Sequence, residues 1–138
     1  MKNSIRIIAL LFLLTHYSCM AQQLVQKPID VYKLKENEQQ FINKPLKNLL
    51  KEVKPEIKMV DGTLNSPDYF TFKFVNHDEY LKGKKQEKKY ISIYVYVKEP
   101  INWKNENRPE GKRFVWTKED LNKYGNYTVV WIRVIGKD

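Results

Sequence analysis

Apolar residues follow three patterns along the chain, and each pattern predicts a different kind of segment. The first is an unbroken run of eight apolar residues at positions 7–14, which follows the basic residues Lys2 and Arg6. A helix that crosses a bilayer needs about 20 apolar residues, so this run is too short for a membrane anchor. Its length and basic flank are typical of a secretory signal peptide, which we assign to residues 1–21.

Two processing sites compete at the end of this signal peptide. Cleavage after Ala21 would leave a protein that begins at Gln22 and has no cysteine, because Cys19 is the only one in the chain. Alternatively, a lipid attached to Cys19 would tether the protein to a membrane, as in bacterial lipoproteins. Ser18 fits that pattern, whereas His16 stands where an aliphatic residue is expected. We therefore predict an exported protein that is periplasmic or secreted, with a lipid anchor as the alternative and no later transmembrane span.

The second pattern is helical and begins only after a polar stretch. Residues 22–34 lack a helical period, so we interpret them as an N-terminal extension of a single domain that covers residues 35–138. A short helix is predicted over residues 34–41. A firmer helix follows Pro45, which suits a first turn, and ends before Pro55. Its apolar positions recur at i, i+3, i+4 and i+7 and comprise Leu46, Leu49, Leu50 and Val53.

The third pattern is the alternation of apolar and polar residues, which predicts β-strands. A short strand is expected at residues 57–60, closed by a turn at Asp61-Gly62. Residues 69–75 and 90–97 alternate more regularly. One predicted face carries Phe70, Phe72, Phe74, Ile91, Ile93, Val95 and Val97, and the opposite face of the second strand carries Tyr90, Ser92, Tyr94 and Tyr96.

The C-terminal part of the chain predicts one more helix and one more strand. Thr117 and Asp120 have the spacing of a helix capping box, and Gly125 suits the helix end. We expect Leu121 and Tyr124 to form the buried side of this helix. Residues 127–135 are apolar on both faces, which predicts a strand in the centre of the sheet.

These elements together predict the fold class. About 13 residues connect the two most regular strands, too few for a crossover helix, so these strands should pair antiparallel. We predict an α+β fold: an antiparallel sheet of three to four strands with N-terminal helices packed on one face.

Composition narrows the possible functions. A chain of 138 residues with 42% hydrophobic residues is long enough for one domain and too apolar to be disordered. Its net charge of +9 favours contact with anions. Lysines greatly outnumber arginines, and an exported protein rarely meets nucleic acid, so we expect no nucleic-acid partner.

The candidate catalytic and metal-binding residues are few. His77 is the only histidine after the predicted signal peptide, whereas zinc sites combine several His or Cys ligands, so we interpret His77 as part of a solvated loop. Ser66 and Ser92 lie outside any nucleophile motif. The carboxylates mostly flank lysines, which leaves a small hydrolase of envelope polymers as the least favoured function. We expect no enzymatic activity, no cofactor and no metal site.

Two polar stretches are candidates for binding. The first, residues 82–89, is predicted to form a lysine-rich hairpin tip between the two best strands; Lys84, Lys85, Lys88 and Lys89 would either bind an anion such as lipid A or an acidic glycan, or simply be solvated. The second is the loop at residues 98–116. It contains Trp103, Arg108 and Arg113, and Trp and Arg are enriched at binding hot spots. Trp103 is either an exposed anchor for a partner or a side chain that fixes its own loop to the core.

The chain also resembles a known group of proteins. The segments Phe41-Ile42-Asn43-Lys44-Pro45-Leu46, Tyr94-Val95-Tyr96-Val97-Lys98-Glu99-Pro100 and Val115-Trp116-Thr117-Lys118-Glu119-Asp120 resemble small exported proteins of Bacteroidetes bacteria, for which no activity is known. The order of helices and strands is similar to small outer-membrane assembly lipoproteins and β-lactamase-inhibitor-like modules, in layout only. This resemblance implies an exported single-domain protein and no catalytic residue.

The favoured function is therefore a non-enzymatic protein-binding module of the envelope or the extracellular space. Its predicted contact surface combines Tyr94 and Tyr96 of the sheet with the loop that carries Trp103, Arg108 and Arg113. The alternative is an anion-binding envelope protein that uses the lysine-rich tip.

Overall fold

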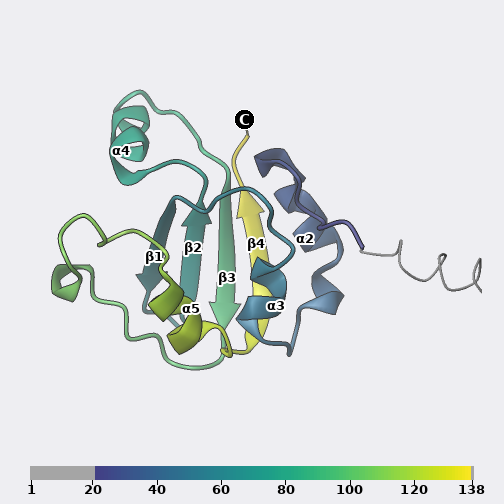
Figure 1. Cartoon of the computed structure of the whole chain (residues 1–138). Coiled ribbons are helices and arrows are strands. Elements are labelled where there is room, and N and C mark those ends of the chain that lie inside the picture. Colours follow the sequence, from purple (N-terminus) through teal and green to yellow (C-terminus); the bar gives the residue numbers. More distant parts are fainter. Residues whose placement is uncertain (1–20, 138) are drawn as a thin grey trace, which may run out of the picture.

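Four β-strands form one antiparallel sheet at the centre of the structure, a computed structural model that describes residues 21–137 (Figure 1). The strands are β1 (Met59–Thr63), β2 (Tyr69–Lys73), β3 (Ser92–Val97) and β4 (Val129–Ile135), and they lie in the sheet in chain order. The predicted α+β fold with an antiparallel sheet is confirmed at this level. The predicted signal peptide up to position 20, including Cys19, lies outside the described residues.

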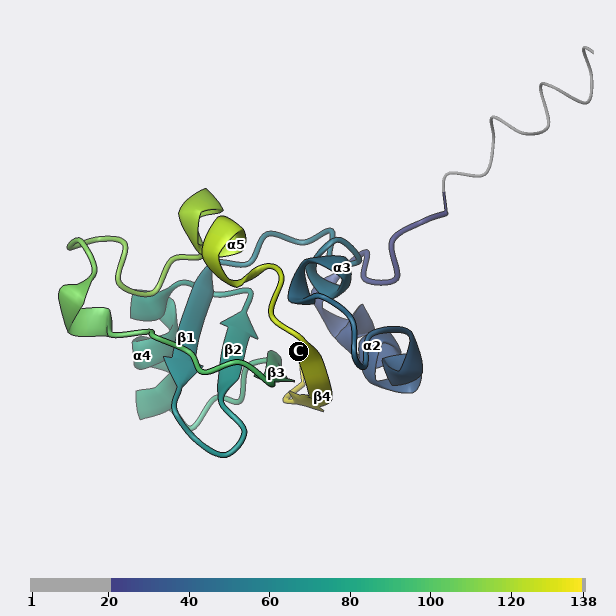
Figure 2. The same ribbon diagram turned by 90° about the horizontal axis from the view of Figure 1, so that it is seen from below.

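Short helices flank the sheet. The α-helices are α2 (Tyr32–Glu36), α3 (Leu46–Leu50), α4 (His77–Lys85) and α5 (Lys118–Tyr124), and the 3-10 turns are η1 (Pro28–Val31), η2 (Glu38–Gln40) and η3 (Asn105–Asn107). Helices α3 and α5 lie on the same side of the sheet (Figure 2), whereas α4 lies beyond the ends of β1 and β2 (Figure 1). Among residues 21–137, no helix combines the length and the apolar content that a bilayer crossing requires.

Successive side chains of each strand alternate between a buried face and an outer face of the sheet. On the buried face, Phe72 lies opposite Ile93, and both side chains are fully buried. On the outer face, Tyr69 lies opposite Tyr96, which in turn lies opposite Trp131. The alternation predicted for the second and third strands is therefore correct, since it follows directly from the period of two of an extended chain.

The predicted N-terminal extension is wrong, because residues 22–34 belong to the folded domain. Val25 and Val31 are fully buried in the same core as the strands. The main chain of Val25 forms a parallel bridge with Val53, and its N–H donates to Glu52 O at 2.9 Å. The predicted helix at 34–41 is also displaced, since α2 begins at Tyr32. The apolar residues of this polar stretch showed no period, although Val25, Val31 and Leu34 among them are fully buried.

The turn predicted at Asp61-Gly62 is also wrong, because β1 continues through both residues to Thr63. Gly62 is needed for packing rather than for a turn. A Cβ atom at this position would lie 2.5 Å from Cβ of Trp103. The glycine therefore lets a tryptophan from a distant loop lie directly on the strand.

Strand β4 is an edge strand and not a central one. It is apolar on both faces because Trp131 and Ile135 lie on the outer face, 44% and 38% exposed. Its free edge is covered by the N-terminal segment. Asn43 N donates to Val129 O at 2.8 Å, and Ile132 N donates to the carboxylate of Glu38 at 3.1 Å.

The connection between β2 and β3 contains helix α4 instead of a lysine-rich hairpin tip. Asn76 caps the helix by accepting a hydrogen bond from Glu79 N at 2.8 Å. Gly83 lies against Tyr90, since a Cβ atom there would be 2.2 Å from the tyrosine hydroxyl. The pairing of β2 with β3 is antiparallel as predicted.

Helix α5 begins with the predicted capping box, in which Thr117 and Asp120 bond reciprocally. Tyr124 is buried, as predicted. Leu121 is 38% exposed, so its predicted burial is wrong. The side chain lies at the mouth of a groove between α5 and α3.

Candidate functional site

An aromatic row crosses the outer face of the sheet. It consists of Tyr69 on β2, Tyr96 on β3 and Trp131 on β4, and the successive ring centroids are 4.8 Å apart. Trp131 is the most exposed member, and the ammonium of Lys35 lies 5.5 Å from the centroid of one of its rings. The rings are tilted against one another by 41° and 35°, and Tyr96 in the middle is only 9% exposed, so the exposed part of the row is chiefly Trp131 with a cation beside it.

Tyr94 extends this row toward the centre of the face. Its ring centroid lies 5.7 Å from that of Tyr69, and its partner on β4 is the exposed Arg133. Burial and the neighbouring Tyr69 raise the pKa of Tyr94, so the hydroxyl stays protonated and can donate a hydrogen bond. Tyr90, which was predicted in the same row, precedes β3 and packs against α4 instead.

Tyr69 and Trp131 were missed in the sequence. The alternation of β2 does place Tyr69 opposite its buried phenylalanines, so the pattern contained a signal for this residue. Trp131 lies in a strand that is apolar on both faces, and only the pairing with β3 shows that its side chain joins Tyr96.

A buried lysine lies at the other end of the outer face. Lys73 is 7% exposed, and its ammonium donates a hydrogen bond to Ser92 Oγ and lies 5.0 Å from the ring centroid of Tyr80 on α4. Burial lowers the pKa of Lys73, and the carboxylate of Asp61 offsets this only in part. A lysine beside a serine hydroxyl can activate a nucleophile. Here Ser92 is 1% exposed, so a substrate cannot reach its hydroxyl in this conformation.

The structure decides between the two interpretations of Trp103. The side chain is 5% exposed and packs edge-on to Phe70, with ring centroids 5.9 Å apart. Its indole N–H donates to Asn105 at 2.7 Å, and Asn105 donates to Asp61 of β1 at 2.9 Å. Trp103 therefore fixes its loop to β1 and cannot serve as an exposed anchor for a partner.

Arg108, another predicted contact residue, is also engaged within the protein. Its guanidinium lies 3.9 Å from the ring centroid of Trp103 and donates two hydrogen bonds of 2.8 Å to the Asp120 carboxylate. Burial acts to raise the pKa of Asp120, but hydrogen bonds from Arg108 and Thr117 outweigh it and hold the pKa below its usual range. A general acid needs the opposite shift, so the arrangement stabilises the loop rather than an acid catalyst.

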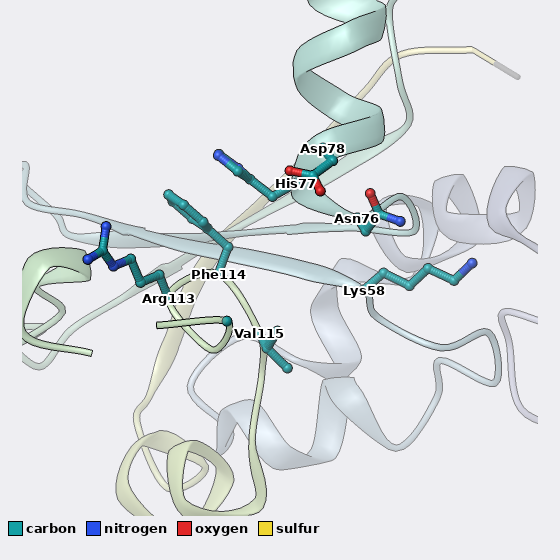
Figure 3. A pocket seen from close by; sticks show the side chains of 8 residues that line it. Lys58, Asn76, His77, Asp78, Arg113, Phe114 and Val115 are labelled. Carbon is teal, nitrogen blue, oxygen red and sulfur yellow. The ribbon is translucent and has the colours of Figure 1, made fainter. Parts of the chain in front are cut away.

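Arg113 remains exposed and lines a separate cavity of about 390 Å³ (Figure 3). His77, at the start of α4, stacks on Phe114 of the loop with ring centroids 3.9 Å apart and an interplanar angle of 9°. The predicted solvated loop is therefore wrong for His77, whose Nδ1 is buried without a hydrogen-bond partner. Figure 3 shows the Lys58 side chain pointing away from Arg113, so the two cations do not converge on one ligand.

The lysines of the predicted tip lie at and after the C-terminal end of α4 rather than on the aromatic row. Lys84, Lys85, Lys88 and Lys89 are all exposed. Within residues 21–137 none of them forms an ion pair, and Lys88 lies 4.8 Å from the ring centroid of Tyr90. A cluster of exposed lysines at a helix C-terminus also complements the helix dipole, so it needs no ligand to be stable.

Arg113 and the four lysines thus lie apart from the other predicted site residues. Tyr94, which is half-buried, and Tyr96, which is only 9% exposed, lie on the outer face of the sheet, whereas Trp103 and Arg108 belong to the interior of the loop. In the part of the chain that is described, no three His, Cys, Asp or Glu side chains gather as a metal site would require. Comparison of the chain with protein-family models, curated proteins and solved structures found no match, so the resemblance to Bacteroidetes exported proteins stays a prediction.

Proposed function

We propose that the chain is an exported, non-enzymatic protein-binding module, and that its contact surface is the outer face of the sheet. The aromatic row of Tyr69, Tyr96 and Trp131 carries this proposal. Tyrosine and tryptophan are enriched at interface hot spots because they bury a large area at a small cost in side-chain entropy. Arg133 flanks the row and offers donors to an acidic or carbonyl-rich partner, whereas Lys35 beside Trp131 is already paired with Glu38.

The edges of the sheet support a contact through the face. Glu38 and Asn43 occupy main-chain groups of β4. On the opposite edge, Val60 N donates to Phe114 O of the long loop at 2.7 Å. A partner strand would have to displace these segments before it could extend the sheet, whereas the exposed Trp131 and Arg133 of the outer face can be reached without any rearrangement.

Helices α3 and α5 lie on the other side of the sheet, and α4 approaches the outer face at its Lys73 end through Tyr80, which leaves the end at Trp131 available. We infer that the N-terminal helices pack on the buried face, because their apolar side chains belong to the same core as the strands. These fully buried side chains are Leu34, Leu46 and Leu49. Export by the predicted signal peptide would present the outer face in the periplasm or outside the cell, and lipidation at Cys19 would present it at a membrane surface.

Anion binding by the lysines at and after the C-terminal end of α4 is the second candidate. It is supported by the exposure of Lys84, Lys85, Lys88 and Lys89 and by the net charge of +9. The two functions differ in their response to salt, because interactions between exposed charges are screened at high ionic strength and aromatic contacts are not.

A capture experiment with paired variants tests the proposal. The chain from Gln22 onward serves as bait for an envelope extract of the source cells, with washes at low and high salt. We expect one protein to be retained at high salt, and we expect Trp131→Ala to reduce its capture by about tenfold or more. The matched control is Leu81→Ala, since Leu81 on α4 is 43% exposed and lies off the aromatic row.

Two results would overturn the proposal. If all bound material leaves the wild-type bait at high salt, the lysines of α4 are the better candidate. If Trp131→Ala and Leu81→Ala retain the partner equally well, the aromatic row is not the contact surface.

A further inference from the structure

A groove between α3 and α5 lies on the side of the sheet where both of these helices lie (Figure 2). Its volume of about 590 Å³ falls in the range of small-molecule sites. The floor is apolar: Trp116 packs edge-on against Phe70 and Phe72, and the ring centroids are 5.6 and 5.3 Å apart. Leu50, Val53 and Ile57 complete the floor, and the exposed side chain of Leu121 forms a wall.

The mouth of the groove is positively charged. Lys47, Lys51 and Lys54 line it, and all three side chains are exposed. None of them forms an ion pair within residues 21–137. Lys47 and Lys51 are four residues apart on consecutive helical turns, where like charges repel each other. Glu56 is the single carboxylate among the lining residues, so a bound anion would meet a net positive rim.

The main chain around the groove has its hydrogen bonds satisfied. Lys47 N donates to Gly125 O at 2.8 Å, which links the two helices, and Lys54 N donates to Val25 O at 2.9 Å. An extended peptide would therefore bury its own N–H and C=O groups against an apolar floor without partners, which is costly. An alkyl chain carries no such groups. These features favour a lipid chain over a peptide as the occupant.

We propose that this groove binds a free single-chain amphiphile with an anionic headgroup, such as a medium-chain fatty acid. The alkyl chain would lie on Trp116, Leu50 and Ile57, and the carboxylate would face Lys51 and Lys54. This site is separate from the aromatic row on the outer face, and it does not depend on the function proposed for that row.

Calorimetric titration with dodecanoate below its micellar concentration tests the proposal. The protein is the chain from Gln22 onward, which keeps every buried core side chain of the described residues because these begin at Val25. We expect saturable 1:1 binding and a change in tryptophan fluorescence as the chain covers Trp116. Dodecyltrimethylammonium has the same alkyl chain and the opposite charge, so it should not bind.

Two variants and their matched controls locate the site. Leu121→Asp places a charge on the wall, at a side chain already 38% exposed, and should weaken dodecanoate binding by about tenfold or more. The double change Lys51→Gln with Lys54→Gln should weaken it by about fivefold or more. The controls are Leu81→Asp and the double change Lys84→Gln with Lys85→Gln. They make the same changes of charge in α4, away from the groove, and neither should change dodecanoate binding. Circular dichroism checks that each variant is folded.

The outcomes separate this proposal from its alternatives. Absence of saturable binding, equal binding of dodecyltrimethylammonium, or unchanged binding in folded Leu121→Asp would each overturn it. A protein captured by the wild-type bait and lost with Leu121→Asp, together with no dodecanoate binding, would assign the groove to a peptide and overturn it too. Trp131→Ala should leave dodecanoate binding unchanged, so failure here and failure of the proposed protein contact are distinguishable.

Discussion

At the scale of single residues, Trp103 is central to how the long loop is held. The side chain occupies space on β1 that exists only because Gly62 has no Cβ atom. It contacts Phe70 and the Arg108 guanidinium, and its indole N–H reaches β1 through Asn105. Together with Ile101 and Trp116, this side chain fixes a largely polar loop to the core.

Trp103→Ala should therefore destabilise the protein by about 3–5 kcal/mol, as large truncations in a core do. Trp131→Ala, at an exposed tryptophan of the outer face, should change the free energy of unfolding by less than about 1 kcal/mol. Urea unfolding followed by circular dichroism measures both values. Equal values for the two variants would contradict the assignment of Trp103 to the core.

Asp120 gives the stability of the protein a defined dependence on pH. Its pKa is lowered in the folded protein, since the hydrogen bonds from Arg108 and Thr117 outweigh the effect of burial. A carboxylate with a lowered pKa contributes stability above its unfolded pKa of about 3.9, and this contribution is lost as the pH falls through the folded value. The pair therefore stabilises the loop at neutral pH and not in strong acid.

Asp120→Asn should lower the free energy of unfolding at pH 7 by about 2 kcal/mol, because it leaves a half-buried arginine without its anion. The difference between variant and wild type should shrink as the pH falls below about 4. Urea midpoints at neutral and acid pH measure this, with the exposed Glu106→Gln as the control. A difference that is independent of pH would mean that the pair contributes through packing alone.

At the scale of elements, each edge of the sheet is covered by a segment from elsewhere in the chain. The Glu38 carboxylate accepts a hydrogen bond from Ile132 N of β4 and is also paired with Lys35. A charged side chain that bonds an edge N–H blocks the approach of a second strand.

Glu38→Ala should therefore promote self-association through β4, because it frees an edge N–H group and removes a negative charge. Sedimentation velocity over a range of protein concentrations detects this as a rise in the average mass. Glu36→Ala removes an exposed carboxylate from α2 and should leave the protein in its original state of association. If the two variants behave alike, Glu38 does not protect the edge.

Helix α4 illustrates why some elements escaped prediction. Its sequence is mostly charged and lacks an apolar stripe, so the lysines of residues 82–89 predict a solvated turn. The helix forms because Asn76 caps its first turn and because Tyr90 and Phe114, from two other segments, pack against Gly83 and His77. The spacing of apolar residues within a segment does not reveal such contacts with distant segments.

At the scale of the whole molecule, the first described residues complete the core. Val25, Val31 and Leu34 are all fully buried, and Val25 is paired with Val53 after α3. Their removal would expose the apolar side chains of α3 and β4 that they cover.

A chain that begins at Lys35 should therefore lose cooperative unfolding or become less stable by about 4 kcal/mol or more, as expected for the loss of several buried aliphatic side chains. The chain from Gln22 is the control, and thermal unfolding by circular dichroism is the measurement. A sharp transition at the same temperature in both chains would show that residues 22–34 are dispensable, as the sequence pattern first indicated.

The surface proposed for binding was predictable only in part. Tyr94 and Tyr96 were predictable, because strict alternation in β3 places them opposite Ile93 and Val95. Their alignment with Trp131 was not, since it depends on the register of β3 with β4. The internal role of Trp103 also depends on a contact between residues that are far apart in the sequence.

The sequence alone determined the features that arise from local physics. Apolar alternation sets the strands β2 and β3, and the spacing of Thr117 and Asp120 sets the start of α5, because backbone geometry and capping act over a few residues. Tertiary structure decided the strand order, the edge position of β4, the burial of Val25 and Trp103, and the groove at Leu121. These features depend on which distant side chains exclude water from one another, and no short window of sequence contains that information.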